Sequence, residues 1–192
     1  MAATAVDALH FTGNPEADAF LGQDALALLI GFALDQQVTV QKAFSAPLEL
    51  KQRLGWWSAG QIAGMRPDEL EDVFRAKPAL HRFPGAMAKR TQELCQVIES
   101  EYGGHAERVW TEASDSADLK KRIEGLPGFG DMKVRSLTAV LWKRLGVEMA
   151  KEIAPDHPTL GDVDSPEALD EYQAKKRAYK AAKRAGTPAS WD

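Results

Sequence analysis

The chain has 192 residues, of which 44% are hydrophobic and 27% charged, with a formal net charge of −4. These values indicate a soluble globular protein built as one ordinary domain or as two small lobes that share a core. No apolar run approaches the roughly 18 residues of a membrane span, and the N-terminus lacks a signal peptide's basic start and apolar core. We therefore expect a cytoplasmic monomer with no membrane partner.

The apolar spacing predicts helices nearly throughout, without strands. Asn14-Pro15 is typical of a helix start, with Asn14 as the N-cap. Further helices are expected, in chain order, over residues 23–34, 38–44, 48–54, 58–65, 67–74, 86–102, 116–124, 131–145 and 166–184. Residues 146–166 hold several prolines and are predicted to be an ordered loop. The fold class is therefore all-α.

Cys95, the single cysteine, lies in the apolar pattern of the expected helix 86–102. One cysteine excludes a disulfide framework, a multi-cysteine zinc site and an iron–sulfur cluster within one chain. We interpret Cys95 as a buried apolar residue and expect no metal centre.

Charge is distributed unevenly along the chain. The first thirty residues hold four acidic residues and neither Lys nor Arg, whereas residues 121–144 hold six basic residues against two acidic ones. Residues 175–184 hold six basic residues and no acidic one, so they form either a solvated helix face or an arm that contacts phosphates. A polyanion would therefore meet the C-terminal half of this acidic protein.

The segment Leu126-Pro127-Gly128-Phe129-Gly130 joins two expected helices. Gly128 and Gly130 permit backbone angles and close approaches that other residues resist, and the helix that follows presents unpaired N–H groups. Such a helix N-terminus attracts anions. The hairpin is therefore predicted to hold a DNA phosphate, with Lys133 and Arg135 adding contacts, although glycines that serve only a turn are the simpler alternative.

The hairpin, with Lys133 and the apolar run 137–145, resembles the helix-hairpin-helix/Gly-Pro-Asp superfamily, which includes endonuclease III and the 3-methyladenine DNA glycosylases. Residues 28–40 resemble that family's early helix, which ends in a glutamine that enters the DNA, and Gln37 is the matching position. Residues 83–104 resemble the family's G-x-x-x-x-K-A helix and its glycine-rich exit. The resemblance covers roughly residues 24–145 and implies a two-lobed helical fold, with residues 1–23 joining the C-terminal lobe and residues 146–192 supplying an acidic loop and a basic helix.

The resemblance implies DNA-binding roles for Gln37, Leu126, Gly128, Phe129, Gly130, Lys133 and Arg135. It also implies a carboxylate that assists loss of the base, for which Asp164 is the best match and Asp162 the second. Both lie further from the hairpin than is usual in the family, and Asp164 before Ser165-Pro166 is also a natural N-cap. The position of the family's nucleophilic lysine is Met132, and Lys133 lies about 100° further round the helix, so strand cleavage by a lyase is not expected.

These features predict a base-excision DNA repair protein whose partner is DNA. The first hypothesis is a monofunctional DNA glycosylase that hydrolyses the N-glycosidic bond of a damaged or mismatched base. The alternative is a catalytically inactive protein that binds abasic or distorted DNA. No cofactor and no iron–sulfur cluster are expected, apart from a monovalent cation at the hairpin.

Overall fold

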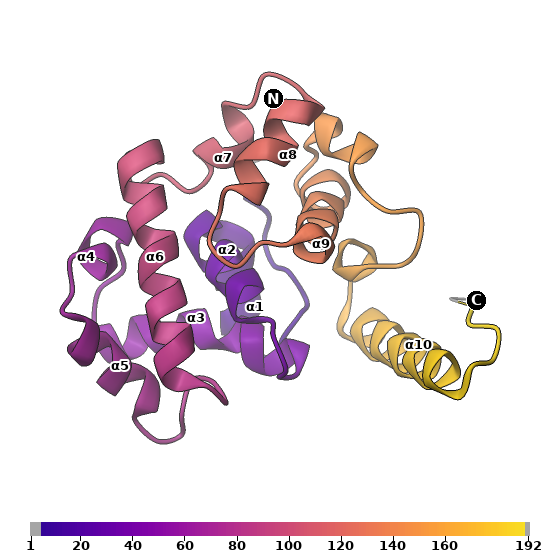
Figure 1. The fold of residues 1–192 in the computed structure, drawn as a ribbon, viewed down its shortest axis with the longest axis horizontal. Helices are drawn as coiled ribbons and strands as arrows, with labels where there is room; N and C mark the ends of the chain where they lie inside the picture. Colours follow the sequence, from indigo (N-terminus) through magenta and orange to yellow (C-terminus); the bar gives the residue numbers. More distant parts are fainter. Residues whose placement is uncertain (1–4, 191–192) are drawn as a thin grey trace.

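A computed structural model describes residues 5–190 (Figure 1). Within that range all regular elements are helical and no strand is present, which confirms the all-α prediction. In chain order they are α1 (Pro15–Gln23), α2 (Ala25–Leu34), α3 (Val40–Leu54), α4 (Ala59–Ala63), α5 (Pro67–Arg75), α6 (Pro84–Tyr102), α7 (Arg108–Thr111), α8 (Ser116–Glu124), α9 (Asp131–Lys143), the 3₁₀ helices η1 (Glu148–Glu152) and η2 (Leu160–Asp162), and α10 (Pro166–Ala185).

Helix α1 begins where the sequence predicts, whereas the second helix, predicted from residue 23, begins at Ala25 because Gln23 ends α1 and Asp24 caps α2. The Asn14 side chain accepts hydrogen bonds from the N–H groups at the start of α1, and Asp24 caps α2 in the same way. Every residue of α2 after Ala25 is buried, so this helix lies in the middle of the molecule (Figure 1). A Cβ at Gly31 would lie 2.5 Å from the ring of Phe44, so glycine lets α3 pack closely on α2.

Residues 40–54 form one helix, where the sequence predicts two that are separated at Pro47. A proline inside a helix costs about 3 kcal/mol because it removes one backbone hydrogen bond and crowds the preceding turn. Here Pro47 is itself buried and its neighbours Ala46 and Leu48 are buried too. Their packing against the core offsets the cost of the proline.

Helices α1, α3 and α6 pack on α2. Helix α1 contacts α2 and α3, while α6 contacts α2, α4 and α5 and carries Cys95, which is fully buried as predicted. Helix α8 leads through residues 125–130 into α9, and η1 and η2 pack along α9. The predicted loop 146–166 thus contains two helical turns.

Helix α10 lies at one side of the molecule (yellow in Figure 1). Leu169 is the single buried residue among its twenty. Gln173 and Gln41 exchange amide hydrogen bonds of 2.7 and 3.2 Å, which link α10 to α3.

No helix in the described range has both the length and the apolar character to cross a membrane by itself. Helices α1 and α2 reach that length only together, and they meet at 113°.

Candidate functional site

The segment between α8 and α9 forms a tight turn that its sequence explains. The Phe129 N–H donates to the Leu126 carbonyl over 3.1 Å, Pro127 takes the second position, and Gly128 takes the third with φ of 86°. Proline followed by a glycine with positive φ is the signature of a type II turn. The Leu126 and Phe129 side chains are buried, so they anchor the turn and only their backbone is available to a ligand.

The start of α9 is open on its outer side. Gly130 is the N-cap residue, and a Cβ placed there would meet nothing within 4 Å. The first turn of a helix leaves N–H groups without intrahelical acceptors, and these groups attract anions. Asp131 lies in this turn, but Arg135 pairs with it at 3.2 Å and offsets its charge.

Arg90 of α6 lies across this hairpin, and the sequence reasoning missed it. A Cβ at Gly128 would lie 2.6 Å from Arg90 Cδ, so the arginine side chain rests on the glycine. Its guanidinium donates to Gln36 Oε1. Arg90 therefore connects the hairpin to the loop between α2 and α3, and both line one shallow hollow with Met132 and Lys133.

Gln37 is exposed and has φ of 56°, the only positive value among the non-glycine residues described. The left-handed region is uncommon for such residues, and it turns the chain sharply between α2 and α3. Gln36 is held by Arg90 and by a 2.7 Å bond from its N–H to the Leu34 carbonyl. The strained turn thus directs Gln36 to the hairpin and leaves Gln37 in solvent.

A cavity of about 500 Å³, which we call the basic cavity, lies between the end of α2, the start of α9, residues 155–159 and α10. It is lined by Phe32, Asp35, Met132, Lys133, Arg135, Ser136, Pro155, His157, Pro158, Thr159, Tyr172, Lys176, Tyr179, Lys180 and Lys183. Its wall thus combines aromatic rings with five Lys or Arg side chains and one carboxylate. Met132 and Lys133 also line the hairpin hollow, so the two spaces adjoin.

Lys133 and Asp35 form the titratable centre of the basic cavity. Lys133 Nζ donates to the Ala33 carbonyl over 3.0 Å. Burial lowers the pKa of Lys133 to about 8, against the opposing effect of Asp35, and the nearby charge of Arg90 lowers it further. Burial raises the pKa of Asp35, while Lys176, Lys133 and Lys180 oppose that change.

Tyr172 of α10 faces the same centre. Burial raises its pKa to about 12, and the negative charges of Asp35 and Asp162 act in the same direction. Its ring lies 5.4 Å from Lys176 Nζ, within the range of a cation–π contact.

The structure places Lys133, and not Met132, toward α2. Met132 is 72% exposed, whereas Lys133 reaches the Ala33 carbonyl. Gly130 caps the helix, so the third residue of α9 is the one that faces α2. Both side chains line the basic cavity, but Lys133 is the one that is held against α2.

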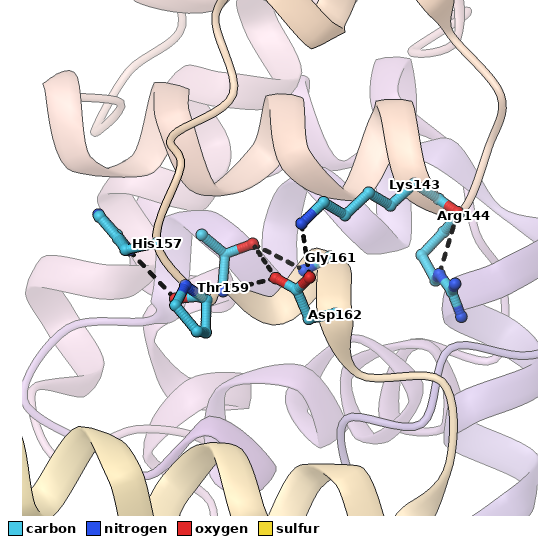
Figure 2. A network of polar contacts seen from close by, with 7 residues as sticks. Lys143, Arg144, His157, Thr159, Gly161 and Asp162 are labelled. Atoms are coloured by element: carbon cyan, nitrogen blue, oxygen red, sulfur yellow. Dashed lines mark hydrogen bonds and ion pairs between the residues drawn. The ribbon is translucent and has the colours of Figure 1, made fainter. Parts of the chain in front are cut away.

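Asp162 is the last residue of η2, and its carboxylate has structural partners (Figure 2). Its carboxylate accepts from the Thr159 N–H at 2.8 Å, completes a capping box with the Thr159 side chain, and pairs with Lys143 of α9. Burial raises the pKa of Asp162, but the Lys143 and Thr159 hydrogen bonds outweigh it, so the net direction is down. In the described structure Thr159, and not Asp162, lines the basic cavity.

Asp164 is exposed, and it is not the cap of α10. Ser165 is the N-cap residue, with a side chain that accepts from the Ala168 N–H. Neither predicted aspartate is thus among the described residues that line the basic cavity, and its one carboxylate is Asp35. No sequence motif indicates Asp35, because only the fold brings α2, α9 and α10 together.

His81 supports the loop that leads into α6. Nε2 lies 3.0 Å from the Leu34 carbonyl and Nδ1 accepts from the Phe83 N–H at 3.0 Å. Burial lowers the His81 pKa, although hydrogen bonds to backbone groups oppose it, so this histidine favours the neutral form. The loop leaves Phe83 39% exposed, and Phe83 and Met132 are the two large hydrophobic side chains exposed in the described range.

Comparison with protein-family models, curated proteins and solved structures returns no match. Within residues 5–190 no group of three or more His, Cys, Asp or Glu side chains is arranged to hold a metal ion. The monovalent cation at the hairpin stays a prediction.

Proposed function

We propose that this is a base-excision DNA repair protein with a two-lobed helix-hairpin-helix fold. The hairpin would hold a backbone phosphate, and the basic cavity would receive a nucleotide that has left the base stack. The observation that carries the proposal is the adjacency of the two spaces through Met132 and Lys133. A phosphate grip beside a cationic, aromatic-lined cavity suits an extruded nucleotide, which carries both a phosphate and a ring.

The reaction we propose first is hydrolysis of the N-glycosidic bond of a damaged or mismatched base. Positive charge develops on the sugar as that bond breaks, and a nearby carboxylate stabilises it or activates water. Asp35 is the carboxylate that lines the basic cavity, so we assign this role to Asp35 in preference to Asp162 and Asp164.

The test is single-turnover cleavage of duplexes with different damaged or mismatched bases, with alkali to reveal abasic sites. We expect Asp35→Asn to lower the rate by about 10²-fold or more, the usual scale for a general acid–base group. Asp162→Asn and Asp164→Asn serve as matched controls and are expected to retain the rate. Loss of activity in either control with full activity in Asp35→Asn would return the role to the 162–164 segment.

A second candidate is chemistry on abasic sites, and the position of Lys133 favours it. A buried amine with a lowered pKa is a nucleophile toward carbonyl carbons. At an abasic site the amine would add to the sugar aldehyde and expel water, which gives an iminium that precedes strand cleavage. Binding of abasic DNA without any turnover would instead support the catalytically inactive alternative.

The phosphate-binding role of the hairpin has its own test in Gly130→Leu. The position has φ of −84° and free space around it, so a side chain fits but covers the start of α9. We expect DNA affinity to fall at least about tenfold, or 1.4 kcal/mol, with an unchanged melting temperature. Gly125→Leu, at the end of α8, is the control. Unchanged affinity in Gly130→Leu would remove the hairpin from the interface.

A further inference from the structure

Helix α10 directs one stripe of side chains into the basic cavity. Tyr172, Lys176, Tyr179, Lys180 and Lys183 all line it. Counted from Tyr172 they stand at i, i+4, i+7, i+8 and i+11, which keeps them on one face of the helix. Three other basic residues of the segment lie outside this lining: Lys175, Arg177 and Arg184. All three are exposed, as are Lys180 and Lys183, whereas Lys176 is partly buried. The basic C-terminal segment is thus divided between an inward and an outward set.

The inward lysines lie in a wall with an excess of positive charge. With Lys133 and Arg135 they make five cationic side chains around one carboxylate, Asp35. No ion pair joins Lys176, Lys180 or Lys183 to an acidic group within residues 5–190, although Lys176 contacts the Tyr172 ring. Lys176 and Lys180 also interact electrostatically with Asp35, the one carboxylate of the wall. Like charges around a partly enclosed space repel one another, and an anion between them would relieve that repulsion.

Packing of the core does not require these lysines. Helix α10 is anchored near its N-terminus, by buried Leu169 and by the amide pair between Gln173 and Gln41. The lysines follow beyond that anchor, on two turns with no buried residue. Their shared direction toward the cavity therefore suits a ligand better than it suits the fold.

We propose that α10 is a phosphate clamp, whose inward lysines bind successive phosphates of the DNA strand that places a nucleotide in the basic cavity. Lys176 and Lys183 are seven residues apart, which is about 10 Å along a helix. One strand of DNA places a phosphate about every 3.4 Å of the helix axis, so the stripe is long enough for about three. That length favours a strand over a single free anion. The proposal rests on the function proposed above.

The test compares two triple variants that remove the same charge. One carries Lys176→Ala, Lys180→Ala and Lys183→Ala, and the other carries Lys175→Ala, Arg177→Ala and Arg184→Ala. Affinity for a labelled duplex with a stable abasic-site analogue is measured by fluorescence anisotropy over a series of salt concentrations. The slope of log affinity against log salt concentration falls in magnitude by about 1 for each lost phosphate contact. The slope of the inward variant is therefore expected to fall by about 2 to 3.

The outward variant is expected to change the slope by less than about 1, since diffuse attraction alone is affected. Equal slopes in the two variants, or an inward variant that keeps the wild-type slope, would overturn the clamp. Competition with inorganic phosphate and with a mononucleotide separates a strand from a small anion. If phosphate or the mononucleotide saturates the wild-type protein but not the inward variant, and displaces the duplex at that concentration, the stripe binds a free anion. That result would also overturn the clamp.

Control measurements distinguish loss of the clamp from misfolding and from failure of the proposed function. Circular dichroism melting checks that each triple variant folds, and if the inward one does not, single Lys→Gln changes with an expected slope loss of about 1 each replace it. If wild-type protein binds no duplex, the proposed function fails together with the clamp. If wild type binds and Gly130→Leu weakens binding while the triple variants stay alike, only the clamp fails.

Discussion

The pair of Lys133 and Asp35 sets the chemistry available in the basic cavity. Each group is buried enough that its charged form is disfavoured, and each supports the charge of the other. An amine with a pKa of about 8 is partly neutral near physiological pH, whereas an ordinary lysine is almost fully protonated. The reactivity of the Lys133 amine should therefore depend on pH in this range.

If Lys133 attacks abasic sites, borohydride trapping of the covalent complex should increase with pH through a midpoint near 8, because only the neutral amine adds to the aldehyde. Asp35 raises the pKa of Lys133, so Asp35→Asn should move that midpoint to lower pH. The measurement is the fraction of protein trapped on an abasic duplex between pH 6 and 9.5. Trapping that persists in Lys133→Met would assign the nucleophile elsewhere.

Arg90 gives a second prediction at this scale. Arg90→Ala removes the side chain that rests on Gly128 and the hydrogen bond to Gln36. Arg90 lines the hairpin hollow, so under the proposed function we expect its guanidinium to contact the bound phosphate. Loss of one charge-assisted contact is worth about 1.5–3 kcal/mol, so duplex affinity should fall at least tenfold. Lys89→Ala is the matched control. Lys89 precedes Arg90 in the chain, its side chain is 77% exposed, and among the described residues it pairs only with Glu93. Similar losses in the two variants would leave Arg90 no special role.

At the level of elements, η2 and α9 form the support behind the basic cavity. A Cβ at Gly161 would lie 2.5 Å from the Ala139 carbonyl oxygen, so η2 rests directly on the α9 backbone. Lys143 and Asp162 join the same two elements through an ion pair (Figure 2). Thr159, the N-cap of η2, lines the cavity beside this contact.

Gly161→Ala should therefore destabilise the protein, because backbone atoms cannot yield as a flexible side chain can. Overpacking of this kind costs about 1–3 kcal/mol, which lowers the melting temperature of a protein of this size by roughly 2–12 °C. Gly130→Ala, with φ of −84° and open space, should melt close to wild type. Equal melting temperatures for the two variants would mean that η2 shifts freely on α9.

Features that depend on neighbouring residues could be predicted from the sequence, whereas features that depend on tertiary packing could not. The type II turn at Pro127-Gly128 and the cap at Asn14 depend on residues within a few positions, so the sequence specifies them. The continuous α3 through Pro47 depends on burial against α2, which overrides a local breaker. Asp35 and Arg90 become site residues only when distant helices meet. Resemblance to a family motif indicates Asp162 and Asp164, but Asp162 serves a capping box and Asp164 is exposed.

For the whole molecule, the distribution of charge matters more than the net charge of −4. The acidic residues of the first thirty positions lie in or near α1 and α2, while basic side chains gather at the start of α9 and along α10. An acidic protein can thus present one cationic surface to a polyanion. If DNA binds there, as proposed above, its affinity should fall steeply as the salt concentration increases.

Helix α10 is the element whose motion should report on that binding. It has one buried residue in twenty, whereas α2 is buried almost throughout, so local opening of α10 should cost far less free energy than opening of the core. Amide hydrogen exchange should therefore be fast along residues 174–185 in the free protein and slow in α2. Saturation with a duplex that carries an abasic-site analogue should slow exchange in α10 in wild type, and much less in the variant without the three inward lysines. Exchange in α10 that is already as slow as in α2, or that DNA slows equally in both proteins, would show that the inward stripe does not couple the helix to the strand.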